Sequence, residues 1–110
     1  MKASSQDFDH VRVVTISGEF TADDTEAFKR TTEDRAGKVK SVILDCRELE
    51  FVDSAALESW LRLQEQLGSQ GGQLRLVAPD TTVSTILELT RLNLAFESHP
   101  SIESAVRSLR

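Results

Sequence analysis

The chain has 110 residues, of which 39% are hydrophobic and 28% are charged, and its formal net charge is −5. This length and balance indicate a single globular domain with one core. An acidic chain without a cluster of Lys and Arg lacks the means to neutralise a phosphate backbone, and no run approaches about 18 apolar residues, so neither nucleic-acid binding nor membrane insertion is expected.

Two strands are predicted before the first helix. The β-branched run at residues 11–16, VRVVTI, predicts a strand. A weaker strand is expected before it, within residues 3–10. Gly18 follows the run and is predicted to be a turn residue.

The first helix is predicted to run from Thr21 to about Ala36. Asp24 follows Thr21 by three residues, and this spacing fits a capping box at a helix N-terminus. Gly37 is expected to end the helix, because glycine readily adopts the left-handed conformation of a C-terminal cap.

The most apolar short run in the chain is SVILDC, at residues 41–46. A continuous apolar run of this length predicts a central strand that is covered on both faces. Cys46 is therefore interpreted as a small buried residue. Asp45, near the expected end of the strand, is predicted to bond to local backbone rather than to a metal.

A second helix is predicted from Asp53 or Ser54 to Leu67. Its apolar stripe follows i, i+3 and i+4 spacing and comprises Ala56, Leu57, Trp60, Leu61, Gln64 and Leu67. Trp60 is interpreted as part of the core. Glu58 and Arg62 are expected to form an i,i+4 pair on the other side of the helix.

The rest of the chain continues the alternation of strands and helices. Residues 73–78 are predicted to form a strand with Leu74, Leu76 and Ala78 on one face. A helix then starts within residues 79–82 and carries Val83, Ile86, Leu87 and Leu89. A short edge strand at residues 96–99 and a last helix from Pro100 or Ser101 to Leu109 follow. The predicted fold class is α/β, with residues 1–110 forming one domain around a mixed, mostly parallel sheet of four or five strands and about four helices.

Signatures of catalysis, metal binding and cofactor binding are missing. His10 and His99 lie in predicted surface segments with no Cys or His at ligand spacing. There is no G-x-S-x-G motif, and the glycine-rich residues 68–72 precede a strand instead of joining a strand to a helix, so they predict a loop and not a phosphate cradle. We expect no catalytic residue, no metal and no cofactor. The N-terminus shows no signal-peptide pattern, which favours a cytoplasmic protein.

One motif stands out at the predicted start of the second helix. Asp53-Ser54-Ala55-Ala56-Leu57 places an Asp-Ser pair directly after the buried strand. It resembles the Asp-Ser-small-Gly-Leu signature of the STAS domain family, which includes the anti-sigma factor antagonists. Further segments resemble the family in the same order along the chain, at residues 16–20, 42–45, 72–77, 86–96 and 102–106. The resemblance covers about residues 11–109 and implies the STAS fold.

The resemblance also implies a function in protein binding. In this family the serine after the Asp is phosphorylated by a partner that is both a kinase and an anti-sigma factor, and the matching residue is Ser54. The residues expected to contact this partner are Asp53, Ala55, Ala56, Glu58, Phe20 and Thr21. The chain departs from the family pattern at Ala56, where the family has Gly, and at Glu58, where it has a small residue.

Alternatives remain at the level of the sequence. Ser54 is also a good N-cap residue with no further role, and Asp53 is either the cap itself or a charge that positions the Ser54 hydroxyl. The alternative function is that of a constitutive STAS subunit of an ABC-type lipid transport complex, docked on its ATPase. The same helix end would then be a static docking surface. The sequence predicts no particular oligomeric state.

Overall fold

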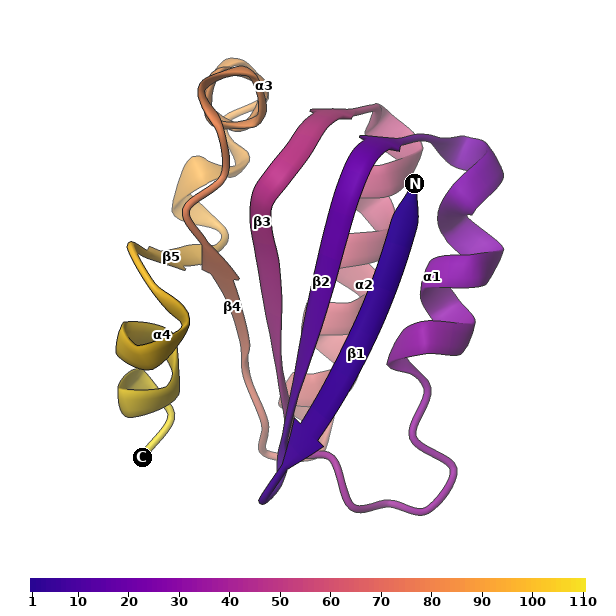
Figure 1. Ribbon diagram of the computed structural model, residues 1–110, viewed down its shortest axis with the longest axis vertical. Helices are drawn as coiled ribbons and strands as arrows, with labels where there is room; N and C mark the ends of the chain where they lie inside the picture. The colour runs from indigo at the N-terminus through magenta and orange to yellow at the C-terminus, as the bar shows by residue number, and fades with distance from the viewer.

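One five-stranded sheet, with its strands in the order β1-β2-β3-β4-β5, organises the structure (Figure 1). The computed structural model describes residues 1–110. The strands are β1 (Lys2–Phe8), β2 (Val11–Phe20), β3 (Ser41–Val52), β4 (Leu74–Val77) and β5 (Glu97–His99). The helices are α1 (Thr25–Thr32), α2 (Ser54–Ser69), α3 (Thr81–Leu89) and α4 (Ile102–Ser108), with short 3₁₀ helices η1 (Ala22–Asp24) and η2 (Leu92–Leu94). Only the β1–β2 pair is antiparallel, which confirms the predicted mixed, mostly parallel α/β sheet.

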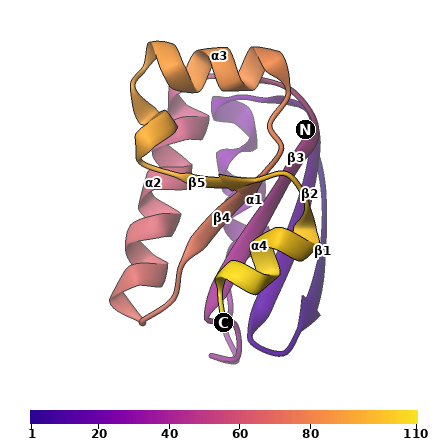
Figure 2. The same cartoon turned by 90° about the vertical axis from the view of Figure 1, so that its left-hand side faces the viewer.

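Helices cover both faces of this sheet. α1 and α2 pack on one face, α4 packs on the other over β3, β4 and β5, and α3 lies across the end where the parallel strands finish (Figures 1 and 2). Successive strand residues point to opposite faces. β3 therefore sends Val42 and Leu44 into the large core cluster and Ile43 into a smaller cluster with Ala105 of α4. This burial on both faces is the reason that the three consecutive residues 42–44 are all apolar.

The predicted core of α2 is confirmed at Trp60, which is fully buried. Its ring stands edge-on to Phe20 and to Phe96, with centroid separations of 6.2 and 6.0 Å. Cys46 is also fully buried, and this burial raises the pKa of its thiol, so the side chain is an inert part of the core. Leu63, absent from the predicted stripe, is buried as well.

β2 and β3 are both longer than predicted. β2 continues through Gly18 to Phe20, so the prediction of a turn at Gly18 is wrong. The residue has a φ of +80°, and the register with β3 shifts between Gly18 and Glu19. A glycine with positive φ here accommodates a β-bulge within a continuing strand. β3 likewise continues beyond Cys46 to Val52.

The segment after β2 begins with a 3₁₀ turn instead of the α-helix itself. Thr21 and Asp24 form the predicted contact, in which the Thr21 N–H donates to the Asp24 carboxylate at 3.0 Å. The pair therefore caps η1, and α1 starts only after it. This N–H group, followed by the N-terminal amine 3.5 Å away, holds the pKa of Asp24 below its usual value.

α1 ends at Thr32 and not at Ala36 as predicted. The guanidinium of Arg12 in β2 donates to the carbonyls of Thr31 and Glu33, at 3.1 and 2.7 Å, and these bonds satisfy the carbonyls at the end of the helix. Gly37 has the expected positive φ but lies in the loop beyond, so it is not a helix cap.

For β4 and α3, the residues predicted to share a buried face are partly wrong. Ala78 follows β4 with a φ of +38° and packs with the cluster under α4, away from Leu74 and Leu76. In α3 only Val83 and Leu87 are buried, whereas Leu89 is largely exposed. The alternation of apolar residues after Gln73 includes Ala78, but the strand ends at Val77, so Ala78 does not share the face of Leu74 and Leu76.

Asp45 lies within β3 and is almost completely buried. It accepts the local N–H of Arg47 at 3.2 Å, as predicted, and it also accepts two bonds from the Arg47 guanidinium, at 2.8 and 2.7 Å. These bonds, chiefly those to the side chain, hold the pKa of Asp45 below its usual value.

The Asp45–Arg47 pair is expected to contribute less to the stability of the fold in acid than at neutral pH. Because the folded pKa of Asp45 is lowered, its contribution to stability is fully present above the unfolded value of about 3.9 and is lost as the pH falls through the folded pKa. Asp45→Asn should lower the free energy of unfolding by roughly 1.5 kcal/mol at pH 7 and by less at pH 3. Urea unfolding across this range measures both. An unchanged difference between the two proteins from pH 7 to pH 3 would contradict the assignment.

Candidate functional site

The Asp-Ser motif lies at a corner where β2 and β3 end side by side. The strands are parallel, Phe20 pairs with Val52, and the Asp53 N–H donates to the Phe20 carbonyl at 3.1 Å. η1 therefore begins beside the start of α2, although the two are far apart in the sequence (Figure 1). The corner is a joint between these two segments.

The side chain of Asp53 holds this joint together. Its Oδ1 accepts the N–H of Ala56 at 2.9 Å, which caps α2, and its Oδ2 accepts the N–H of Ala22 at 2.9 Å, which anchors η1. A carboxylate is favoured here because the first N–H groups of a helix have no partners within the helix and carry partial positive charge. Of the two roles left open for Asp53, the structure shows that of the cap.

Ser54 is the first residue of α2 and is exposed. Because Asp53 fills the cap position, the Ser54 hydroxyl is not used for capping. The interpretation of Ser54 as the N-cap is therefore wrong. The hydroxyl stands in solvent at the positive end of a 16-residue helix, where added negative charge is tolerated.

The other predicted contact residues fall into two groups. Glu58 is exposed, and Thr21 and Ala55 are half-buried, so all three lie at the surface of the corner. Phe20 and Ala56 are completely buried. Phe20 packs against Phe28 and Trp60 in the core, and Ala56 faces the sheet from α2. Their side chains do not face a partner, and we leave both out of the docking surface.

The corner is strongly acidic. Residues 19–26 and 48–59 hold eight of the 18 acidic residues of the chain and none of its 13 Lys and Arg residues. The remainder of the chain is therefore net positive, so the two segments that meet at this corner carry the whole negative balance of the protein.

The sequence matches the model of the STAS domain over residues 2–105. The chain belongs to the STAS domain family. No match is found among the curated proteins. The match covers nearly the whole chain, so the joint described above is part of the STAS domain itself.

Solved structures share the fold of this STAS domain. A protein of Thermotoga maritima assigned as an anti-sigma factor antagonist is 23% identical, with 98% of this chain and 94% of that chain covered and a TM-score of 0.87. The anti-sigma factor antagonist SpoIIAA, in its unphosphorylated form, is 20% identical, with 99% and 96% covered and a TM-score of 0.85. The phosphorylated form of Bacillus SpoIIAA has a TM-score of 0.75. The murine anion transporter Solute Carrier 26 family member A9 is 22% identical over 94% of this chain but only 18% of its own, with a TM-score of 0.70.

Outside the corner, we looked at metal-ligating clusters, membrane-spanning helices and the histidines of this STAS domain. No group of three or more His, Cys, Asp or Glu residues is placed to hold a metal ion, and no helix is both long and apolar enough to cross a membrane. His99, expected in a surface segment, is half-buried. Its Nδ1 lies 2.9 Å from Ser104 Oγ and its Nε2 lies 2.7 Å from the Glu97 carboxylate, so it joins β5 to α4.

Sequence reasoning missed the contact between Asp53 and Ala22. No local pattern predicts it, because Ala22 offers only a backbone N–H and the two residues are 31 positions apart. The available signal was indirect: the sheet was predicted to be mostly parallel, and segments that follow adjacent parallel strands begin at the same end of the sheet.

Proposed function

We propose that this STAS domain is an anti-sigma factor antagonist-like binding module of the cytoplasm. Its partner is both an anti-sigma factor and a serine kinase, and phosphorylation of Ser54 by this partner ends the interaction. The observation that carries the proposal is the exposed Ser54 hydroxyl at the start of α2, beside a carboxylate that already fills the cap. No catalytic group is needed in the chain itself.

The domain is expected to remain folded when Ser54 is phosphorylated. A phosphate adds about −1.5 to −2 charges and three acceptor oxygens. At a helix N-terminus these meet free N–H groups and the positive end of the helix dipole. Asp53 keeps its bonds to Ala22 and Ala56, since neither uses the Ser54 hydroxyl.

The contact between this domain and its partner, in contrast, is expected to be lost when Ser54 is phosphorylated. A partner that packs closely against the small Ser54 hydroxyl has no space for a phosphate. The chain supplies no Lys or Arg within residues 19–26 and 48–59 to pair with the added charge. Misplaced charge across an interface costs several kcal/mol.

The solved relatives support this proposal. SpoIIAA is an anti-sigma factor antagonist, and it has been solved in both phosphorylated and unphosphorylated forms. A fold that accommodates both forms is the requirement of the switch proposed for Ser54.

The direct test is a phosphorylation assay. The purified chain, incubated with its cognate kinase and ATP, is expected to gain one phosphate, and tandem mass spectrometry is expected to place it on Ser54. Thr81 is a matched internal control, since it is an exposed hydroxyl that follows the Asp80 cap of α3 in the same way. Phosphate on Thr81 and Ser54 alike, or on neither, would contradict a specific switch.

The alternative is a constitutive subunit docked on a transporter ATPase. The likeness to a domain of the anion transporter indicates that this fold also occurs within transport proteins. In that case the partner would be an ATPase, and phosphate at Ser54 would not control the complex. Identification of the proteins that an immobilised chain retains from native lysate separates the two functions.

A further inference from the structure

We propose that the groove between α1 and α2 extends the docking surface and receives an acidic side chain of the protein partner that docks at the Asp53–Ser54 corner. This inference rests on the proposed function. It adds a second contact of opposite charge, which fixes the orientation of the partner.

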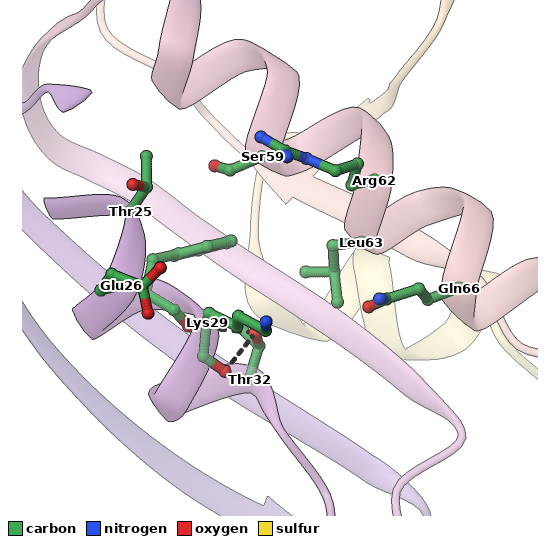
Figure 3. Close-up of a pocket in the computed structure, with 9 residues that line it drawn as sticks. Thr25, Glu26, Lys29, Thr32, Ser59, Arg62, Leu63 and Gln66 are labelled. Atoms are coloured by element: carbon green, nitrogen blue, oxygen red, sulfur yellow. Dashed lines mark hydrogen bonds between the residues drawn. The ribbon is translucent and has the colours of Figure 1, made fainter.

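The groove is a hollow of about 190 Å³ between the two helices, and seven of its nine lining residues are polar or charged (Figure 3). Phe28 and Leu63 are its only hydrophobic lining residues, and both are nearly buried. Small-molecule sites usually measure about 300–1,000 Å³ and are mostly apolar. The size and lining therefore suit one polar side chain from a protein better than a free ligand.

Two cations from different helices line this groove. Lys29 comes from α1 and Arg62 from α2, and Figure 3 shows Arg62 running back along its helix toward Ser59. Glu58 was expected to pair with Arg62, but the structure contains no such ion pair, and Lys29 likewise has no carboxylate partner. Glu26 is the only acidic residue in the lining. The two unpaired cations favour a carboxylate as the occupant.

The groove is continuous with the corner. Thr25, at one end of the groove, directly follows η1 of the corner. Ser59 and Arg62, on the other wall, lie five and eight residues after Ser54 along α2. A partner seated over Ser54 and Glu58 therefore reaches the groove without bridging a gap.

The corner and the groove together form a surface with negative charge in one part and positive charge in the other. Residues 19–26 and 48–59 hold eight acidic residues and no Lys or Arg, whereas the adjacent groove presents Lys29 and Arg62. A partner that presents a carboxylate to the groove and no carboxylate to the corner fits in one orientation only. Charge arrangements of this kind set the register of an interface and reject wrong partners.

The test begins by identifying a partner whose binding depends on Ser54. Proteins retained from native lysate by the immobilised wild-type chain, but not by Ser54→Asp, are purified for binding measurements. Arg62→Glu is expected to weaken this binding about tenfold or more, because it places like charges across the contact. Arg30→Glu is the matched control, since Arg30 of α1 is exposed like Arg62 of α2 but lies outside the groove. It is expected to change the affinity less than about threefold.

A second measurement does not depend on affinity. A zero-length carbodiimide joins an amine directly to a carboxylate, so it should link Lys29 to an Asp or Glu of the partner. Lys29→Arg should remove the link and keep the affinity. Links only from Lys2, Lys38 or Lys40, or wild-type affinity in Arg62→Glu, would overturn the inference and leave the proposed function standing. If Ser54→Asp releases no protein, the proposed function fails and the inference fails with it.

Discussion

Ser54→Asp is expected to weaken binding of the partner more than a hundredfold while the domain stays folded. A loss of about 3 kcal/mol corresponds to this factor, and one misplaced charge at a close contact is enough to cause it. Ser54→Ala is expected to bind like the wild type and to resist release by the kinase with ATP. Titration calorimetry with the purified partner measures both variants.

Two further variants serve as controls for this experiment. Thr81→Asp places the same charge at the first position of α3, after the Asp80 cap, and shows what such a charge does to stability alone. Ser4→Asp adds a charge on the exposed strand β1, opposite Thr15 of β2 and thus five residues before the Phe20 end of that strand. Both should fold like Ser54→Asp, and Ser4→Asp should keep the wild-type affinity. Equal binding by Ser54→Asp and wild type would remove the basis of the switch.

Asp53→Ala is expected to lower the free energy of unfolding by about 2–3 kcal/mol, the largest effect on stability that we expect at the corner. Loss of an N-cap costs about 1 kcal/mol, and the N–H of Ala22 loses its acceptor as well. Asp80→Ala is the matched comparison, because Asp80 caps α3 through Val83 alone, at 2.8 Å. It should cost about 1 kcal/mol.

Asp53→Asn separates the two bonds of Asp53. An amide side chain has one acceptor oxygen, so it serves the N–H of Ala56 or that of Ala22 but not both. Its stability should fall between those of wild type and Asp53→Ala in urea unfolding. Amide hydrogen exchange at Ala22 should be faster in Asp53→Ala than in wild type. Equal losses in Asp53→Ala and Asp80→Ala would show that the anchoring of η1 contributes nothing.

The joint at Asp53 has a further consequence for binding. Because one carboxylate fixes both η1 and the first turn of α2, the corner presents its two segments in a set geometry before any partner arrives. Preorganised surfaces lose less conformational entropy on association. Asp53 is in this sense a positioning residue for the surface around Ser54.

The sequence by itself determined the order of elements, the fold class and the place of the Asp-Ser motif. The apolar run at residues 41–46 predicted a strand buried on both faces, and the spacing along α2 predicted a buried Trp60. These predictions hold because burial against a sheet imposes a period on the residues that form each element, and this period is visible locally.

Tertiary structure alone decided where elements end and which polar groups meet. α1 stops at Thr32 as Arg12 of β2 binds its last carbonyls, and Gly18 lies in a bulge because β2 continues along β3. Arg62 lines the groove instead of pairing with Glu58, and Asp53 reaches Ala22 across the corner. These outcomes depend on contacts between segments far apart in the chain, and no local period encodes such contacts.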